Sequence, residues 1–349
     1  MLRNTTPFPA ETSWTRDERG AEFWLVAVRA SFEIDHEGRQ SPALIQTEVQ
    51  RAPVFVGDPL KTGLLRDSDF VLEKSGTDIL VEGCAYAPEG RPTRRCSVSL
   101  KVHTVDKTVN VVGERRISKG LFGLSMTRPK PFLEMPMTWE HTYGGWDRDG
   151  DKEEWVPSNP AGKGFAIDRS HLDGTIAPNW EYPSVPYRGA KSGRPAAFGP
   201  VAQHWQPRVQ YGGTYDEQWQ QTRDPLVPED FDRRYFRCAP ADQQTHTPLI
   251  GYEEVSLRGM TADGTLSFTL PRISFNFITT FRRYGDIQQK PSIHTLWLMP
   301  DRRRFEIIYV SALEVPLGRE EKLIGTTVLI RKRIGTPPSI SRTGVWSAD

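Results

Sequence analysis

The fold is decided by residues 23–34, which read FWLVAVRASFEI. The stretch begins with apolar residues only and then alternates between apolar and polar ones. Unbroken apolar runs are typical of strands buried on both faces, and alternation is typical of strands with one face in water. We therefore expect a β-strand that is buried on both faces and emerges into water at one end.

Similar strand signals recur at short intervals along the chain. The clearest is the alternation over residues 96–102, CSVSLKV, which places one face on a core and the other in water. Segments rich in β-branched and aromatic residues predict further strands at 78–86, 108–112, 255–258, 266–270, 273–281, 293–298, 305–313 and 323–330. Turn residues such as Asp263-Gly264 separate these segments, as in antiparallel hairpins. The sequence therefore predicts a mainly β fold with an antiparallel, sandwich-like scaffold.

The middle of the chain, residues 139–242, has a different composition. It holds six of the ten tryptophans, 11 of the 28 prolines and 11 of the 29 glycines. Proline and glycine at this density interrupt regular ladders, whereas disordered linkers are poor in aromatic residues. We expect a long irregular excursion that is held against the sheets, and loops of this length usually have a function.

These patterns give one domain over residues 1–335. Its β core comprises residues 1–138 and 243–335, and the excursion lies between them. Residues 336–349 contain Pro337-Pro338 and few apolar side chains, so we expect a loosely held C-terminal tail.

Composition narrows the possible partners and the compartment. The 45 Lys and Arg residues nearly balance the 44 Asp and Glu residues, and a net charge of +1 gives no field that would gather nucleic acid. Three cysteines without CxxC spacing suit a reducing compartment. Neither an apolar signal segment nor a membrane span is visible, so we expect a cytoplasmic protein with no nucleic-acid or membrane partner.

Motifs for catalysis, metals or cofactors are not found. The acidic run Asp147–Asp151 resembles a calcium loop, but Gly150 and Ser158 occupy the wrong positions for the EF-hand pattern. The seven histidines lack zinc spacing, and GxSxG, Walker and GxGxxG motifs are missing. We therefore expect no enzyme activity, no catalytic residues, no metal site and no cofactor.

The candidate binding residues are the aromatic side chains of the excursion. They are Trp139, Tyr143, Trp146, Trp155, Trp180, Trp205, Tyr215 and Trp219. Exposed rings of this kind anchor protein partners, or serve as platforms for sugar rings beside a carboxylate pair. The alternative is that most of them pin the excursion to the β core.

Several short motifs, taken in order, resemble the bacterial family called domain of unknown function 2169. The resemblance is carried by Asn4-Thr5-Thr6-Pro7-Phe8, Phe23-Trp24-Leu25-Val26, Thr142-Tyr143-Gly144-Gly145-Trp146-Asp147, Asn159-Pro160-Ala161-Gly162-Lys163-Gly164-Phe165, Phe198-Gly199-Pro200, Gly213-Thr214-Tyr215-Asp216, Asp230-Phe231-Asp232 and Ala239-Pro240-Ala241-Asp242-Gln243-Gln244. Each motif is short, and their common order and spacing give the resemblance its weight.

The resemblance implies an adaptor or chaperone that is encoded beside a type VI secretion effector. Such a protein binds the secreted toxin, or a spike-tip protein, and assists loading onto the secretion spike. Two other functions fit the same sequence: a carbohydrate-active or carbohydrate-binding β protein, and a purely structural subunit that associates with itself. The resemblance carries no catalytic residues, and the sequence leaves the oligomeric state open.

Overall fold

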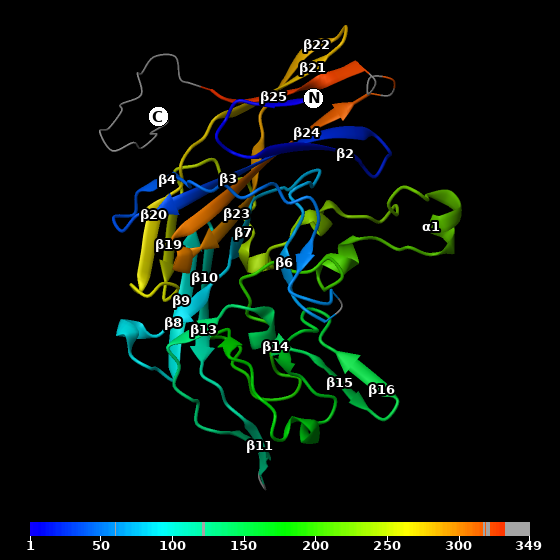
Figure 1. The fold of residues 1–349 in the computed structure, drawn as a ribbon. Coiled ribbons are helices and arrows are strands. Elements are labelled where there is room, and N and C mark those ends of the chain that lie inside the picture. Colours follow the sequence, from blue (N-terminus) through cyan, green and yellow to red (C-terminus); the bar gives the residue numbers. More distant parts are fainter. Residues whose placement is uncertain (60, 121–122, 317, 319–321, 332–349) are drawn as a thin grey trace.

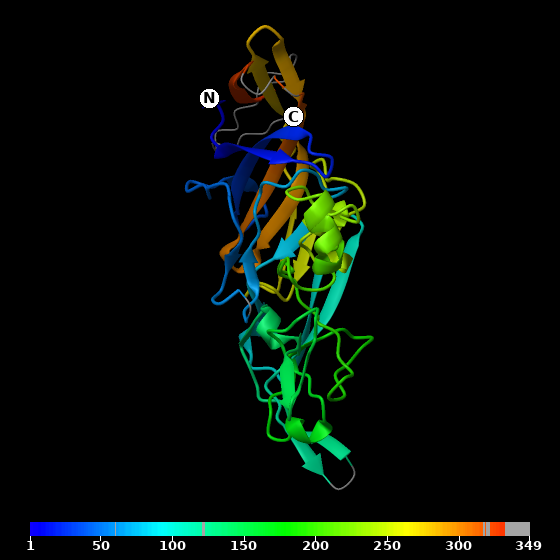
Figure 2. The same cartoon turned by 90° about the vertical axis from the view of Figure 1, so that its right-hand side faces the viewer.

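Figure 1 shows the computed structural model, which describes all residues except 60, 121–122, 317, 319–321 and 332–349. The predicted tail, 336–349, lies outside the described residues. The molecule is elongated (Figures 1 and 2). The hairpin of β21 (Phe275–Phe281) and β22 (Gly285–Gln289) lies at one end, and β11 (Ile117–Gly120) lies at the other.

The longest strand of the fold is the one predicted from residues 23–34. It forms β3, which joins a six-stranded sheet in the order β2-β3-β24-β23-β7, with β4 also paired to β3. The strands are β2 (Ala10–Arg16), β3 (Glu22–Ile34), β4 (Gln40–Pro42), β7 (Asp78–Val81), β23 (Ser292–Met299) and β24 (Arg304–Val315). Because β24 pairs with β3 from Glu22 to Glu33, the two strands form the centre of the sheet.

A second sheet of five strands, in the order β18-β10-β9-β19-β20, completes the scaffold. Its strands are β9 (Arg95–Val102), β10 (Val105–Val112), β18 (Trp180–Glu181), β19 (Glu254–Arg258) and β20 (Thr265–Thr269). Val28 and Ile307 of the first sheet share one hydrophobic core with Leu100, Val109 and Leu257 of the second. The predicted mainly β, sandwich-like fold is therefore confirmed.

A four-stranded sheet, β1-β25-β21-β22, extends the scaffold at its upper end. Its strands are β1 (Leu2–Asn4), β21 (Phe275–Phe281), β22 (Gly285–Gln289) and β25 (Leu323–Ile330). Two-stranded ladders add β5 (Val54–Phe55) with β6 (Leu64–Arg66), β8 (Cys84–Tyr86) with β13 (Glu134–Pro136), and β11 (Ile117–Gly120) with β12 (Gly123–Met126). The sheets are mostly antiparallel, but β7 runs parallel to β23, and β1 runs parallel to β25.

Two details of the predicted strands are wrong. The strand expected at 78–86 is divided into β7 and β8 at Glu82 and Gly83, where Gly83 has φ +154°. β3 also stays buried at Arg29 and Ser31, and Glu33 is its only fully exposed residue. Charged partners on neighbouring elements keep Arg29 inside, which the alternation of the strand alone does not indicate.

The excursion, residues 139–242, is largely irregular, as predicted. It contains short strands: β14 (Tyr143–Gly144), β15 (Trp146–Asp149), β16 (Lys152–Trp155), β17 (Lys163–Gly164) and β18. It also contains α1 (Glu217–Thr222) and the 3-10 helices η2 (Trp139–His141), η3 (Arg169–Leu172), η4 (Arg208–Tyr211) and η5 (Arg233–Phe236). The remaining 3-10 helices are η1 (Pro88–Gly90), η6 (Ala241–Gln243) and η7 (Pro300–Arg302).

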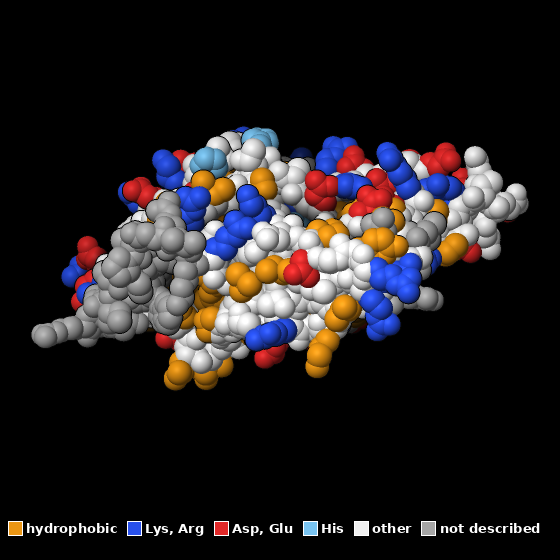
Figure 3. Space-filling view, turned by 90° about the horizontal axis from the view of Figure 1, so that it is seen from above, with side chains coloured by type: hydrophobic (Ala, Val, Ile, Leu, Met, Phe, Trp, Pro, Cys, Tyr) orange, Lys and Arg blue, Asp and Glu red, His pale blue; other side chains and the backbone are white. Residues whose placement is uncertain are grey.

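The surface carries both signs of charge. Figure 3 shows basic and acidic side chains interspersed on the upper end, with hydrophobic side chains in small groups between them. No helix within the described part of the chain has the length and apolar character needed to span a bilayer.

Candidate functional site

Four of the eight aromatic candidates are buried, and they hold the excursion to the core. Trp139 and Tyr143 are each 6% exposed, and Trp180 and Trp205 are each 1% exposed. Trp139 donates from Nε1 to the Pro200 carbonyl at 2.9 Å and meets Trp205 edge-on, with ring centroids 5.4 Å apart. These four rings therefore belong mainly to the packing of the excursion, and among them Tyr143 also lines a surface groove.

The strands β15 and β16 form a hairpin whose base is built from two of the short sequence motifs. Asn159 Nδ2 donates to the carbonyls of Trp139 at 2.9 Å and Tyr143 at 3.0 Å, and to Thr142 Oγ1 at 2.8 Å. A Cβ on Gly144, which has φ +155°, would lie 2.1 Å from the Asn159 carbonyl. The motifs around Tyr143 and Asn159 therefore interlock and fix the hairpin in place.

The outer face of this hairpin exposes two tryptophans side by side. Trp146 on β15 and Trp155 on β16 are directly opposite in register, and their side chains are 62% and 55% exposed. The next pair on the same face is Arg148 and Glu153, which form an ion pair at 2.8 Å. Because residues opposite each other in a ladder lie on one face, the hairpin presents an aromatic pair beside an ion pair. We call these four residues the tryptophan face.

The inner face of the hairpin is tied to the body of the excursion. Asp147 accepts a hydrogen bond from the Ile167 N–H at 2.9 Å and pairs with His171 Nδ1 at 2.7 Å. Slight burial acts to raise the pKa of Asp147, but its hydrogen bonds with His171 and Ile167 outweigh this and lower that pKa. The hydrogen bond to Asp147 raises the pKa of His171. Both shifts favour the charged pair, which braces the tryptophan face from behind.

A groove of about 510 Å³ opens beside the hairpin. Its lining residues are Tyr143, Glu153, Glu154, Trp155, Val156, Pro157, Phe165 and Lys191. Trp155 thus belongs both to the tryptophan face and to the groove, so the two form one continuous surface. Aromatic and aliphatic side chains with a few charges at the edge are the composition typical of protein-binding surfaces.

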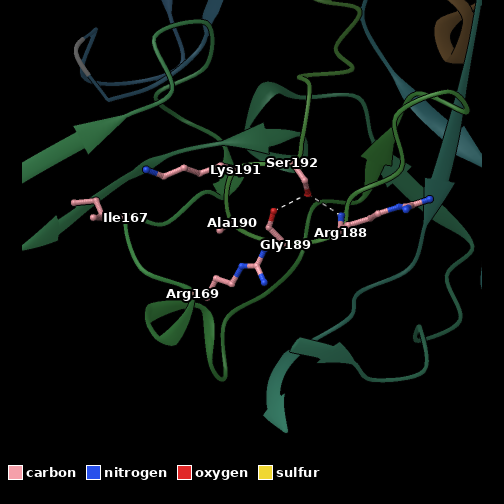
Figure 4. A pocket seen from close by; sticks show the side chains of 7 residues that line it. All are labelled: Ile167, Arg169, Arg188, Gly189, Ala190, Lys191 and Ser192. Carbon is pink, nitrogen blue, oxygen red and sulfur yellow. Dashed lines mark hydrogen bonds between the residues drawn. The ribbon is translucent and has the colours of Figure 1, made fainter. Parts of the chain in front are cut away.

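A second cavity of about 360 Å³ is lined by basic side chains, but their charged ends do not point to a common centre (Figure 4). Its long cationic side chains belong to Arg169, Arg188 and Lys191, and Figure 4 shows Lys191 and Arg188 pointing to opposite sides. Lys191 Nζ lies 3.3 Å from Glu154 Oε2. An anion site requires donors aimed at one point, and this arrangement does not supply them.

The other two aromatic candidates lie near α1, apart from the hairpin (Figure 1). Tyr215 is 58% exposed and packs edge-on against Trp219, with ring centroids 4.7 Å apart. Trp219 is partly buried and donates from Nε1 to the Leu226 carbonyl at 2.8 Å. Trp219 therefore braces the loop after α1, and Tyr215 remains an exposed candidate.

Glu154, beside Trp155, lacks the raised pKa of a glycosidase acid. A glycosidase acid needs a raised pKa. Hydrogen bonds from Lys152 and Lys191 instead lower the pKa of Glu154, and Glu153 is paired with Arg148. Within the described residues, no group of His, Cys, Asp and Glu side chains could hold a metal ion.

Buried charges form a feature that the sequence analysis missed. Arg29 on β3 is 2% exposed and lies 2.8 Å from Asp69 and 2.5 Å from Glu306 on β24. Asp78 on β7 is fully buried between Lys74 and Arg237, each 2.7 Å away. Such charges are retained only when paired. They connect the six-stranded sheet to the excursion, which contributes Arg237.

We expect His294 on β23 to make the stability of the protein depend on pH. It is 4% exposed, and its Nδ1 has no hydrogen-bond partner. Burial, and then the charge of Lys74, lower the pKa of His294 to about 3. The unfolded chain binds this proton near a pKa of about 6.5, so the contribution is present above that pH and is lost as pH falls towards 3.

We expect the free energy of unfolding to fall by up to about 1.4 kcal/mol per pH unit from this residue below pH ~6. The His294→Gln variant removes the titrating group, so its stability changes less between pH 6.5 and 5. Urea denaturation of both proteins at several pH values within that window measures the difference. Parallel pH profiles for the two proteins would refute the assignment.

The protein is thus a mainly β scaffold that displays an exposed aromatic surface on a hairpin held in place by hydrogen bonds. In its described part, no group of side chains could hold a metal ion. Residues 19–309 match the family described as an uncharacterized protein conserved in bacteria, DUF2169. The chain belongs to this family, and the predicted resemblance is confirmed. No curated protein and no solved structure matches the chain.

Proposed function

We propose that this protein is a non-enzymatic, cytoplasmic adaptor that holds a type VI secretion toxin and assists its loading onto the spike. The observation that carries the proposal is the tryptophan face. Two large rings stand more than half exposed on a hairpin that is fixed at its base by Asn159 and from behind by Asp147. Solvent-exposed tryptophans on a rigid element are typical anchors of protein interfaces.

Rigidity is the physical reason why this surface suits docking. A surface that is already ordered loses little conformational entropy when a partner binds, so more of the contact energy appears as affinity. Trp, Tyr and Arg dominate binding energy at interfaces, and the hairpin with its groove supplies Trp146, Trp155, Arg148 and the edge of Tyr143. The description of the matched family names no function. The adaptor role therefore rests on this surface and on the role that the sequence resemblance implies.

The proposal is tested in cells by deleting this chain and following the toxin encoded beside it. An adaptor that stabilises its toxin predicts that the toxin becomes less abundant and is no longer secreted, and that expressing the chain in trans restores both. The matched control is a second secreted protein encoded elsewhere, whose abundance should not change. Unaltered toxin abundance and secretion in the deletion strain would count against the proposal.

Carbohydrate binding is the second candidate function, because the groove places the Trp155 ring beside Glu153 and Glu154. Sugar rings stack on exposed tryptophans and hydrogen-bond to nearby carboxylates. Glycan-array binding that depends on Trp155 would favour this function.

A further inference from the structure

The strand β2 forms one edge of the six-stranded sheet, and its backbone is open on the outer side. It pairs only with β3, in a regular register from Ala10–Val28 to Arg16–Glu22. The Arg29 N–H donates to the Pro9 carbonyl at 3.1 Å. Antiparallel strands alternate between hydrogen-bonded and non-hydrogen-bonded residue pairs. Because Pro9 and Arg29 form a hydrogen-bonded pair, every second residue of β2 after Pro9 directs its N–H and C=O groups towards β3.

The alternation places the N–H groups of Thr12 and Trp14 on the open side. The residues that bond to β3 lie two, four and six positions after Pro9. They are Glu11, Ser13 and Thr15. Among the described residues, no acceptor meets the N–H of Thr12 or of Trp14. A row of outward N–H and C=O groups is a template for another strand.

Three features that often block an edge, namely proline, lysine and a bulge, are missing from β2. Its two charged side chains, Glu11 and Arg16, are paired with Arg51 and Glu22. Edges are commonly blunted by proline, lysine, a bulge, shortness or a covering segment. The sequence of β2, AETSWTR, contains neither proline nor lysine, and its ladder with β3 has no shift in register. With seven residues, β2 is the longest edge strand in the described part of the chain.

Two other edges, those of β20 and β7, are approached by neighbouring segments. The edge of β20 is approached by the start of β4 and the turn before it. Gln40 Nε2 donates to the Thr269 carbonyl at 2.7 Å, and a Cβ on Gly38 would lie 2.8 Å from the Ser267 carbonyl. The edge of β7 is met by a bridge between Asp78 and Gln244. β2 instead lies on the outside of the upper part of the molecule (Figure 1).

Trp14 adds a side-chain anchor to this edge. It is 43% exposed, and its ring packs on that of Trp24, with centroids 4.9 Å apart. A strand added beside β2 would place alternate side chains on the same face as Trp14, where apolar groups would cover the ring. The other face of the new strand would lie beside Glu11 and Ser13.

We propose that β2 accepts an extended segment of the toxin as an added strand of the six-stranded sheet. The segment alternates apolar and polar side chains, and its apolar side chains cover Trp14. This inference rests on the proposed adaptor function and assigns to it a second contact surface. Main-chain hydrogen bonds supply the affinity in this mode of recognition, and the side chains supply the specificity.

The test uses the full chain and the toxin encoded beside it, with Thr12→Pro as the variant. Proline removes the outward N–H of Thr12 and leaves the β2–β3 bonds of Glu11 and Ser13 intact, as edge strands allow. Thr12→Ala keeps the N–H and is the matched control. We expect Thr12→Pro to weaken binding about tenfold or more, the equivalent of one net backbone hydrogen bond, and Thr12→Ala to bind as the unmodified chain does.

Hydrogen exchange followed by mass spectrometry gives the second measurement. Binding should slow exchange in the peptide that covers residues 10–16, and unfolding curves should show that both variants fold. A complex that forms without protecting residues 10–16, or that tolerates Thr12→Pro, overturns the added strand and leaves the adaptor function standing. Failure of the chain to bind the toxin at all overturns both.

Discussion

The free energy of unfolding of the Asp78→Asn variant should be about 3–5 kcal/mol lower than that of the unmodified chain. Asp78 is 0% exposed, and its carboxylate lies 2.7 Å from both Lys74 Nζ and Arg237 Nε. It also accepts a hydrogen bond from the Cys238 N–H at 2.8 Å. Neutralising Asp78 leaves two cations buried without a counter-charge, and this causes the large loss.

Guanidinium denaturation at pH 7 measures the change. Asp263→Asn is the matched control, because Asp263 pairs with Arg303 at 3.1 Å on the surface, where its side chain is 64% exposed. That control should shift stability by no more than about 1 kcal/mol. Equal unfolding free energies for the two variants would contradict the structural role of the buried charges.

Acid titration of the unmodified chain provides a further check on Asp78. Burial opposes ionisation of Asp78, but the charges of Lys74 and Arg237 outweigh it and lower the pKa to about 2. The unfolded value is about 3.9, so the stabilisation is complete above that pH and is lost as pH falls towards 2. The stability curve of Asp78→Asn should therefore be flatter than that of the unmodified chain in this window.

On the proposed adaptor function, the double variant Trp146→Ala/Trp155→Ala should bind its toxin at least about 100-fold more weakly. Central tryptophans at interfaces each contribute on the order of 2 kcal/mol or more, and 1.4 kcal/mol is a factor of ten in affinity. Because both rings are more than half exposed, their removal should change folding stability by only about 1 kcal/mol. Calorimetric titration with the toxin measures the affinity.

Tyr284→Ala is the control for the tryptophan variant. Tyr284 is 45% exposed and follows β21, at the opposite end of the molecule from the hairpin (Figure 1). Removing it tests whether any exposed ring contributes equally. An affinity that stays unchanged in the folded double variant would remove the tryptophan face from the interface.

Local sequence patterns predicted the main strands because those patterns reflect packing on a sheet. β3 lies within one residue of the predicted 23–34, and β9 shows the predicted alternation of buried and exposed side chains. β2 was not predicted, because AETSWTR is mostly polar and its strand geometry comes from pairing with β3. Edge strands of this kind depend on tertiary contacts more than on composition.

The site was predicted only in part, because burial of a ring depends on residues far away in the sequence. Trp139 and Trp146 lie close together in the sequence, yet Trp139 packs on Trp205 and Trp146 faces water. The buried ion pairs were missed for the same reason: Arg29 and Glu306 are 277 residues apart and meet only when β3 pairs with β24. Order and spacing of the short motifs did identify the family.

The claim that this chain is a docking protein for a secreted toxin is tested most directly by native mass spectrometry. The purified chain is mixed at micromolar concentration with the toxin encoded beside it. We predict a single complex of fixed, integral stoichiometry. Two separate masses at every mixing ratio, with both proteins folded, would contradict the account.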